Sequence, residues 1–174
     1  MEEIIDILNE DGKLSGNFTT KKIIHEKGLL HMTVHIAIIS KDRKRILLQK
    51  RSNDKNLYKN TWDISVGGHV SKGEMPLEAL KRELKEEIGL NYIDYDIKQI
   101  DTFRECLKDN EVICNELVYL YLMFEDINTE ELVLQKEELS KVSWFTKNEF
   151  IELINKKEIV PHLKEYKELL NIMI

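Results

Sequence analysis

Three glutamates stand close together in one short segment and could bind a metal ion. Glu83, Glu86 and Glu87 are spaced i, i+3 and i+4, so a helix would place their carboxylates on one face. Like charges at this spacing destabilise an isolated helix by roughly 0.2–0.5 kcal/mol per pair. A hard divalent cation needs several oxygen ligands from one small region, which these carboxylates would supply. We therefore interpret the segment as a metal site, and a solvated acidic face is the alternative.

The element that must position these carboxylates is a helix. Pro76 stands at a position typical of a helix start, and Gly89 at a position typical of a helix end. An apolar stripe at helical spacing is expected to face a sheet, and its members are Leu77, Leu80, Leu84 and Ile88.

The residues around the glutamates resemble the signature of the Nudix hydrolases, G-x5-E-x7-R-E-U-x-E-E-x-G-U with U aliphatic. Every fixed position of that signature is matched between residues 68 and 90. The resemblance implies an α/β/α sandwich with a mixed β-sheet, and Mg²⁺ or Mn²⁺ as the cofactor. The matching residues are Gly68, Glu74, Arg82, Glu83, Leu84, Glu86, Glu87, Gly89 and Leu90.

The resemblance also implies a reaction and a role for each residue. Glu83, Glu86 and Glu87 would bind the metal, and the Gly68 carbonyl is a further candidate oxygen ligand. Arg82 and Glu74 would orient these carboxylates, as partners of metal ligands commonly do. Water would attack a phosphorus atom of a small diphosphate compound, a P–O–P bond would break, and a glutamate would accept the proton of the water.

The segments beside this signature resemble the isopentenyl-diphosphate isomerase branch of the same superfamily. That resemblance implies that Arg51 and Lys55 hold a substrate diphosphate. It also implies that four further residues are parts of the metal and diphosphate sites: His25, His31, His69 and Glu116. Each of these residues has a plainer interpretation, as a hydrogen-bonded histidine near a sheet, a loop cation or an edge carboxylate.

Two positions depart from the isomerase pattern. Gly67 stands where the isomerase has a catalytic Cys, and Cys114 stands where it has a Glu. Glycine cannot transfer protons to or from an alkene, so the isomerase reaction would lose one acid/base partner. The chain is therefore expected to be a diphosphate hydrolase. The alternatives are an isomerase and a non-catalytic nucleotide-binding module.

Two further pairs of residues have both a functional and a plainer interpretation. Glu137 or Glu138 could act as the base, although solvated surface is the expected interpretation of both. Cys106 and Cys114 lack CxxC spacing and are expected to be inert.

Length and composition set further expectations. The 174 residues suggest one domain, and 42% hydrophobic with 33% charged residues is typical of a globular protein. A net charge of −6 argues against binding to a nucleic-acid polymer. No apolar run approaches the roughly 20 residues of a membrane helix, and the acidic N-terminus is unlike a signal peptide. We expect a cytoplasmic protein, and a homodimer is left open.

The hydrophobic pattern predicts a sheet with few helices. Strands are expected at 4–8, 33–39, 46–50, 62–66, 97–103, 116–124 and 142–145, and a loop should contain Gly67, Gly68 and Gly73. Helices are expected at 76–88, at about 147–156 behind a Thr146–Glu149 capping box, and at about 161–173. The final helix should bury one stripe in the core or in a dimer contact, namely Leu163, Tyr166, Leu169 and Leu170. Residues 1–30 are expected to be a short β extension of a single domain, although 13–31 show no clear pattern.

Overall fold

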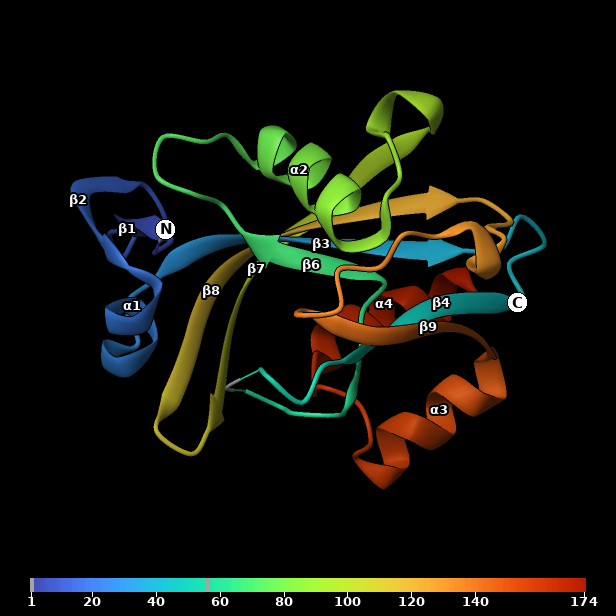
Figure 1. The fold of residues 1–174 in the computed structure, drawn as a ribbon. Coiled ribbons are helices and arrows are strands. Elements are labelled where there is room, and N and C mark those ends of the chain that lie inside the picture. Colours follow the sequence, from blue (N-terminus) through green and yellow to red (C-terminus); the bar gives the residue numbers. More distant parts are fainter. Residues whose placement is uncertain (1, 56) are drawn as a thin grey trace.

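The computed structural model describes residues 2–55 and 57–174, which form two sheets and four α-helices (Figure 1). The strands are β1 (Ile4–Leu8), β2 (Leu14–Thr20), β3 (His31–Ile39), β4 (Arg45–Arg51), β5 (Trp62–Asp63), β6 (Val66–His69), β7 (Ile97–Asp109), β8 (Val112–Phe124) and β9 (Leu139–Thr146). The helices are α1 (Lys21–Lys27), α2 (Pro76–Ile88), α3 (Lys147–Lys156) and α4 (Leu163–Ile172), with short 3₁₀ turns at Tyr92–Asp94 and Thr129–Glu131.

The central sheet is mixed, as the sequence predicts. Its order is β5-β4-β3-β8-β7, with β6 paired to β3 and β9 paired to β4. The β3–β8 pair is parallel, and the other pairs in this sheet are antiparallel. Figure 1 shows α2 on one side of the sheet and α3 and α4 on the other. The expected α/β/α sandwich is confirmed.

Alternate side chains of β3 point to opposite faces of the sheet and pack in two separate layers of the core. Ile36 and Ile38 pack with the buried face of α2, and Ala37 and Ile39 pack with α3 and α4. Because both faces are covered, β3 is apolar along most of its length. The polar residues that remain on it are therefore informative about the site.

The helix α2 begins at Pro76 and ends at Gly89, as the sequence predicts. Gly89 has a φ of +81°, the left-handed conformation that closes many helices. Leu80 and Leu84 are fully buried. The expectation for Leu77 is wrong, because this residue is 42% exposed in the first turn, outside the part of the helix that packs on the sheet.

The chain between Trp62 and His69 makes two strands and not one. It leaves the edge of β4 after β5 and pairs with β3 as β6. Ser65 bridges these two neighbours, because its hydroxyl donates to the Leu47 carbonyl and accepts from the Ile38 amide at 2.9 Å. The expectation of a loop at Gly67 and Gly68 is therefore wrong, since both glycines lie in β6.

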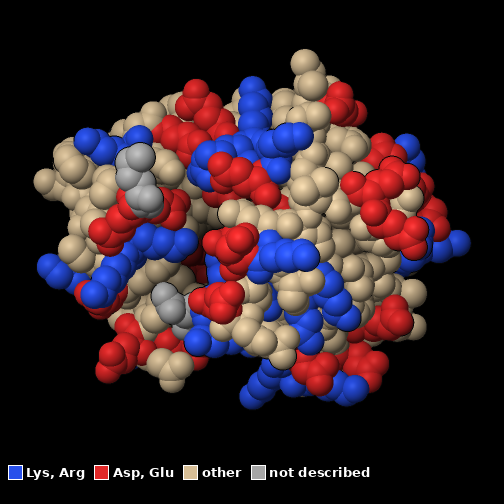
Figure 2. Space-filling model, in the orientation of Figure 1, with Lys and Arg blue, Asp and Glu red and all other residues tan. Residues whose placement is uncertain are grey.

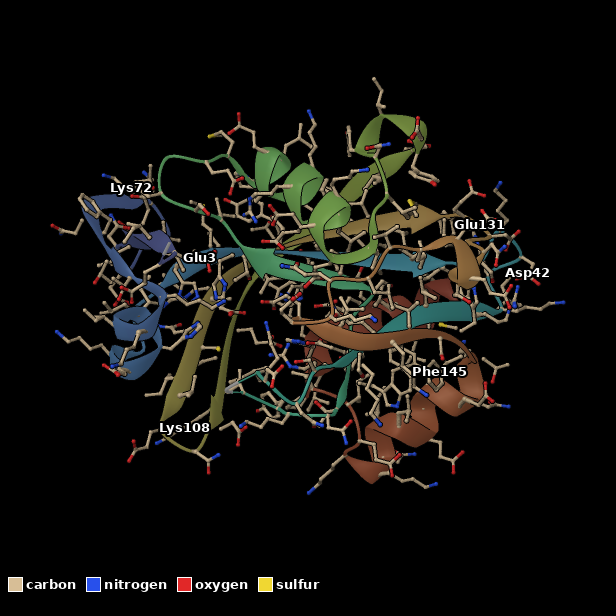
Figure 3. The ribbon with its side chains drawn as sticks, viewed as in Figure 1. Glu3, Asp42, Lys72, Lys108, Glu131 and Phe145 are labelled. Carbon is tan, nitrogen blue, oxygen red and sulfur yellow. The ribbon has the colours of Figure 1, made fainter. Side chains whose placement is uncertain are left out.

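The strands β7 and β8 are much longer than the expected 97–103 and 116–124. They form one hairpin whose pairing runs from Ile97↔Met123 to Asp109↔Val112. Figure 3 shows Lys108 near the tip of this hairpin, well beyond the sandwich. The charged residues of the β7 extension stand in adjacent pairs, Arg104–Glu105 and Lys108–Asp109, so the period-2 alternation of a strand is missing there.

The C-terminal helices follow the sequence closely. The Thr146–Glu149 capping box forms, with the Thr146 amide donating to the Glu149 carboxylate at 2.7 Å. The helix α4 buries Tyr166 and Leu169, but Leu163 is 61% exposed at its first position, contrary to the expected stripe.

The N-terminal segment pairs β1 with β2 in a separate two-stranded sheet and then forms α1. Thr20 caps α1 by accepting a hydrogen bond from the Ile23 amide, and Gly28 ends the helix at a φ of +60°. A helix was not expected here, and it places His25 beside the central sheet. No helix among the described residues is long and apolar enough to cross a membrane.

Candidate active site and metal centre

A cavity of about 990 Å³ opens beside β6 and α2. Figure 2 shows this face hollowed near its middle, with acidic and basic side chains gathered around the opening. Its walls come from α1, α2, β3, β6, the chain that follows β4 and the β7–β8 hairpin. Every residue that the sequence assigns to the site, except Glu74 and His31, lies on its wall.

Arg82 is the centre of a network of hydrogen bonds on α2. Its guanidinium donates to both carboxylate oxygens of Glu74, at 3.0 and 2.9 Å. It also donates to the His69 carbonyl at 2.9 Å, to Glu83 at 2.6 Å and to Glu86 at 3.2 Å. These contacts hold the pKa of Arg82 above its usual range and fix the carboxylates in place.

Glu83 lies directly over Gly68. A Cβ atom built on Gly68 would stand 2.1 Å from the Glu83 carboxyl carbon and 2.2 Å from its Oε1. Real Cβ atoms do not approach other atoms so closely, so position 68 must be glycine for Glu83 to hold this place. Two positions of the signature, Gly68 and Glu83, are therefore linked by a steric requirement as well as by their chemistry.

Glu87 is buried beside Glu83. Its Oε2 accepts hydrogen bonds from the Gln49 side chain at 3.1 Å and from the Gly67 amide at 3.2 Å. Burial, followed by the charge of Glu83, raises the pKa of Glu87 to about 8. Burial also raises the pKa of Glu83 to about 7, against the opposing charge of Arg82. Two carboxylates that resist ionisation are suited to a divalent cation, which would compensate both charges.

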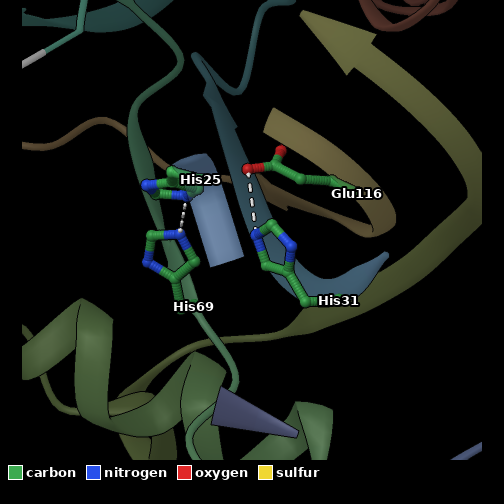
Figure 4. A group of neighbouring side chains, drawn as sticks. All are labelled: His25, His31, His69 and Glu116. Atoms are coloured by element: carbon green, nitrogen blue, oxygen red, sulfur yellow. Dashed lines mark hydrogen bonds and ion pairs between the residues drawn. The ribbon is translucent and has the colours of Figure 1, made fainter. Parts of the chain in front are cut away.

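Three histidines and one glutamate form a second candidate metal centre on the cavity side of β3 (Figure 4). One ligand atom from each residue lies within 4.8 Å of all the others. The Nε2 atoms of His25 and His69 are 3.1 Å apart, and His31 Nε2 is 3.7 Å from Glu116 Oε1. The four residues come from α1, β3, β6 and β8, so the sequence does not show that they meet.

The ring nitrogens of this cluster are prepared for a cation. His31 Nδ1 donates to the Leu29 carbonyl at 2.8 Å, and its buried Nε2 has no hydrogen-bond partner among the described residues. Burial and the neighbouring His31 lower the pKa of His25 to about 4, and burial lowers the pKa of His69 well below its usual value. Although burial opposes it, His31 lowers the pKa of Glu116 to about 2. The uncharged imidazoles of His25 and His69, together with the His31 ring and a carboxylate, are a donor set that first-row transition metals and zinc prefer.

The two cations assigned to substrate binding already have acidic partners. Arg51 donates to Asp63 Oδ2 at 2.8 Å and to the Leu57 carbonyl at 3.1 Å. Lys55 forms an ion pair with Glu138 across the cavity wall. Glu138 therefore lines the cavity and is not the solvated surface residue that the sequence suggests.

Some residues of the cavity wall are not found from the sequence. Lys21 lies there, 3.3 Å from Glu3. Gln49 on β4 does not line the cavity but donates a hydrogen bond to Glu87, which does. His35 and His162 also line the cavity and belong to a buried charge network with Glu165. The signal for His35 was a histidine within an otherwise apolar strand, whereas His162 and Glu165 gave none.

The cysteines are free, as expected from their spacing. Cys106 is exposed on β7, and burial raises the pKa of Cys114 above its usual range. Neither thiol has the environment of a reactive thiolate.

Comparison with known proteins places this geometry in a family. The NUDIX domain model matches residues 29–170. Nudix hydrolase 3 of Arabidopsis thaliana is 35% identical over 161 residues, which cover 90% of this chain but only 21% of that protein. An uncharacterised Nudix hydrolase of Listeria monocytogenes is 31% identical over 90% of this chain and 88% of its own.

Two further comparisons bear on the fold and on the narrower resemblance. A crystal structure from Deinococcus radiodurans superposes with a TM-score of 0.73 over 90% of this chain and 91% of the other, at 20% identity. An isopentenyl-diphosphate isomerase of Saccharopolyspora erythraea is 28% identical over 83% of this chain and 72% of its own. The sequence identity to this isomerase is thus lower than the identity to the two Nudix hydrolases.

Proposed function

This chain belongs to the Nudix hydrolase family, and we propose that it hydrolyses the P–O–P bond of small diphosphate compounds with the help of a divalent metal. The observation that supports this most directly is the position of the Glu83 carboxylate against Gly68, where only a glycine leaves room for it. Arg82 donates hydrogen bonds to Glu83 and Glu86, and Glu87 is buried beside Glu83. A structural role does not require this concentration of carboxylates on one helix.

The carboxylate set fits Mg²⁺ or Mn²⁺. Glu83, Glu86 and Glu87 are hard oxygen donors, and the Gly68 carbonyl is a fourth candidate. Burial raises the pKa values of Glu83 and Glu87, and a bound cation would favour their ionised forms. Such a cation, when bound, neutralises phosphate charge and favours attack by water on phosphorus. Glu74 and Arg82 orient the carboxylates, and a cavity glutamate accepts the proton of the attacking water.

The substrate diphosphate would be held by the cations of the cavity wall. Arg51 is suited to a bidentate phosphate contact, and Lys55 and Lys21 are suited to contacts as point charges. All three have carboxylate partners in the structure, so each would exchange a carboxylate for a phosphate oxygen when substrate binds.

We further propose that His25, His31, His69 and Glu116 bind a second metal ion. The unpartnered Nε2 of His31 supports this, because a buried ring nitrogen without a partner is costly unless a ligand satisfies it. This site continues the resemblance to the isomerase branch, so an isomerase remains the alternative function. Gly67 opposes that alternative, because the isomerase pattern has its catalytic Cys at this position.

One experiment tests these possibilities together. The purified chain is incubated with a panel of nucleoside-diphosphate compounds and prenyl diphosphates, with and without Mg²⁺, and the products are identified by ³¹P and ¹H NMR. Metal-dependent cleavage of a P–O–P bond is expected. Isomerised prenyl diphosphate, or nucleotide binding without any turnover in the presence of Mg²⁺ or Mn²⁺, would contradict the hydrolase proposal.

Other inferences from the sequence stay predictions. They are one Nudix domain over residues 1–174, a cytoplasmic location and the possibility of a homodimer. The cavity supports a small molecule as the substrate, because the residues assigned to the site line a cavity and not an open basic surface.

A further inference from the structure

A second buried charge network lies on the cavity wall, on the other side of Gly67 from the α2 carboxylates. His35 Nδ1 donates to Glu165 Oε2 at 2.7 Å. His162 contacts Glu105 through Nδ1 and Asp63 through Nε2, the latter at 3.2 Å. The His35 and His162 rings meet edge to face, 4.7 Å apart. Together with the pair between Arg51 and Asp63, these residues are called the His35 network below.

The two histidines of this network differ in one respect. Both ring nitrogens of His162 face carboxylates, so its hydrogen-bonding capacity is used within the protein. His35 uses only Nδ1, and none of the described residues bonds to its Nε2. Because His35 also lines the cavity, its Nε2 is open to a bound molecule.

Gly67 is the reason that this nitrogen is open. It pairs with His35 across β3 and β6, so a side chain at position 67 would lie beside the ring. A Cβ atom there would stand 3.3 Å from His35 Cδ2 and 3.7 Å from Nε2. The resemblance to the isomerases implies a Cys side chain at this position, and its absence here exposes the ring edge.

The same cavity wall also carries apolar side chains, and they include Leu57, Leu107, Val112, Cys114 and Val160. A hydrocarbon group packed there would cover His35 Nε2 and leave a buried polar nitrogen without a partner. Such a loss weakens binding by roughly 10- to 100-fold. A group with a hydroxyl would avoid that loss.

We propose that this part of the cavity is a specificity subsite, in which His35 Nε2 forms a hydrogen bond with a hydroxyl of the group attached to the substrate diphosphate. A hydroxyl both donates and accepts, so it pairs with the ring whether Nε2 carries a proton or a lone pair. The subsite rests on the proposed function, because the diphosphate must be anchored at the α2 carboxylates. It favours hydroxylated organic diphosphates over plain hydrocarbon diphosphates as substrates.

The test uses two ligands that cannot be hydrolysed and differ by one hydroxyl: the butyl and 3-hydroxybutyl esters of methylenebisphosphonic acid. Their binding to the full chain is measured by calorimetry in the presence of Mg²⁺. The hydroxylated ligand is expected to bind roughly 10- to 100-fold more tightly. Turnover plays no part, so the result does not depend on catalytic activity.

Variants assign the preference to His35. His35→Leu alone would strand Glu165, which has no other described partner and is fully buried, so both are replaced in His35→Leu/Glu165→Met. That pair should bind the two ligands equally, whereas His35→Gln, which keeps a side-chain N–H near Nε2, should retain a preference. Gly67→Ala should reduce the preference by covering the ring edge. Glu168→Gln is the control. Glu168 lies on the exposed face of α4, the helix that also carries Glu165, and this variant should behave as wild type.

Each outcome is decisive. Equal binding of the two ligands by the wild-type chain, or tighter binding of the butyl compound, would overturn the subsite while leaving the proposed hydrolase intact. Binding of neither ligand with Mg²⁺ present would overturn the diphosphate site and the subsite with it. If the double variant does not fold, Gly67→Ala still decides the question, because an unchanged preference in that variant would show that the ring edge of His35 is not involved.

Discussion

The carboxyl group of Glu83 occupies the space where any residue other than glycine at position 68 would place its Cβ atom. This contact joins β6 to α2 and brings the Glu83 carboxylate next to the backbone of Gly68. Arg82 holds the same carboxylate from the other direction at 2.6 Å. The position of the candidate metal ligand is therefore set by a steric limit on one side and an ion pair on the other.

Gly68→Ala is expected to displace Glu83 and weaken metal binding. A contact of 2.1 Å must open beyond 3.0 Å, so the carboxylate moves by about 1 Å or more. Loss of an outer partner of a metal ligand commonly costs 10–100-fold in affinity, and displacement of the ligand itself should cost at least about that. Titration with Mn²⁺ followed by EPR measures the affinity. Lys85→Ala on the exposed face of α2 is the control, and unchanged Mn²⁺ affinity in Gly68→Ala would show that Glu83 is not a ligand.

Glu87→Gln should nearly abolish hydrolysis and at the same time stabilise the metal-free protein. In the folded chain the pKa values of Glu83 and Glu87 are raised to about 7 and about 8 from 4.5. Between pH 4.5 and about 8 the folded state therefore binds more protons than the unfolded state. The free energy of unfolding then falls as the pH rises through this range. Because Glu87→Gln has no charge at position 87, its stability should fall less as the pH rises.

Thermal unfolding in EDTA measures this effect. At pH 8 the Glu87→Gln variant should gain at least about 1 kcal/mol, which corresponds to a Tm higher by roughly 2–4 °C. Glu86→Gln is the matched control, because Glu86 is half exposed and should give no such gain. A Tm of Glu87→Gln below wild type across this pH range would contradict the pKa assignment.

The sequence predicts the helix α2 and the arrangement of its three carboxylates well, because both are local. Glu83, Glu86 and Glu87 lie on one helix, and Gly89 marks where the helix ends. Their spacing along the chain is therefore almost their spacing in the molecule. Residues such as Leu77 and Leu163 show the limit of this reasoning, since periodicity gives the face of a helix but not how far the sheet beneath it extends.

The parts of the site that the sequence misses depend on contacts between distant segments. His35 meets Glu165 across 130 residues, and His162 meets Glu105 across 57. The break between β5 and β6 is similar, because it depends on Ser65 bonding to both β3 and β4. No spacing rule within one segment reports such pairings.

The histidine cluster is expected to bind a transition metal independently of the α2 carboxylates. Zn²⁺ at micromolar concentration should raise the Tm of the wild-type chain, because ligands that bind only the folded state stabilise it. His69→Asn removes one of the four donors and should abolish the shift, while the Tm without metal changes little. Metal content by mass spectrometry provides the second measurement. An equal shift in wild type and His69→Asn would place the metal elsewhere.

Lys55→Ala is expected to raise KM more than it lowers kcat. Lys55 would leave Glu138 to contact a substrate phosphate, and a charged hydrogen bond of this kind corresponds to roughly a 10- to 100-fold rise in KM. Lys59→Ala, an exposed lysine of the same segment, is the control and should leave both constants unchanged. A collapse of kcat at constant KM would instead give Lys55 a part in the chemical step.

The chain should not interconvert isopentenyl and dimethylallyl diphosphate. Isomerisation needs one group that protonates an alkene carbon and another that removes a proton, and Gly67 can do neither. His35 lies beside Gly67, but it is a poor substitute. Burial alone would lower the pKa of His35, yet the charge of Glu165 and its hydrogen bond raise it, so the His35 imidazolium is a weaker acid than an ordinary histidine.

Deuterium exchange measures this prediction directly. Isopentenyl diphosphate is incubated with the chain in deuterated water, with Mg²⁺ and with Zn²⁺ or Mn²⁺ supplied for the histidine cluster, and is followed by NMR. No enzyme-dependent deuterium should enter the carbon skeleton, because Glu116 would act without a second acid/base partner and such a partner contributes roughly 10²–10⁴-fold. Gly67→Cys tests whether the missing acid/base partner is the reason, since it restores the residue that the isomerase resemblance places at position 67. Incorporation by the wild-type chain at a rate sufficient for turnover would restore the isomerase interpretation and remove the hydrolase one.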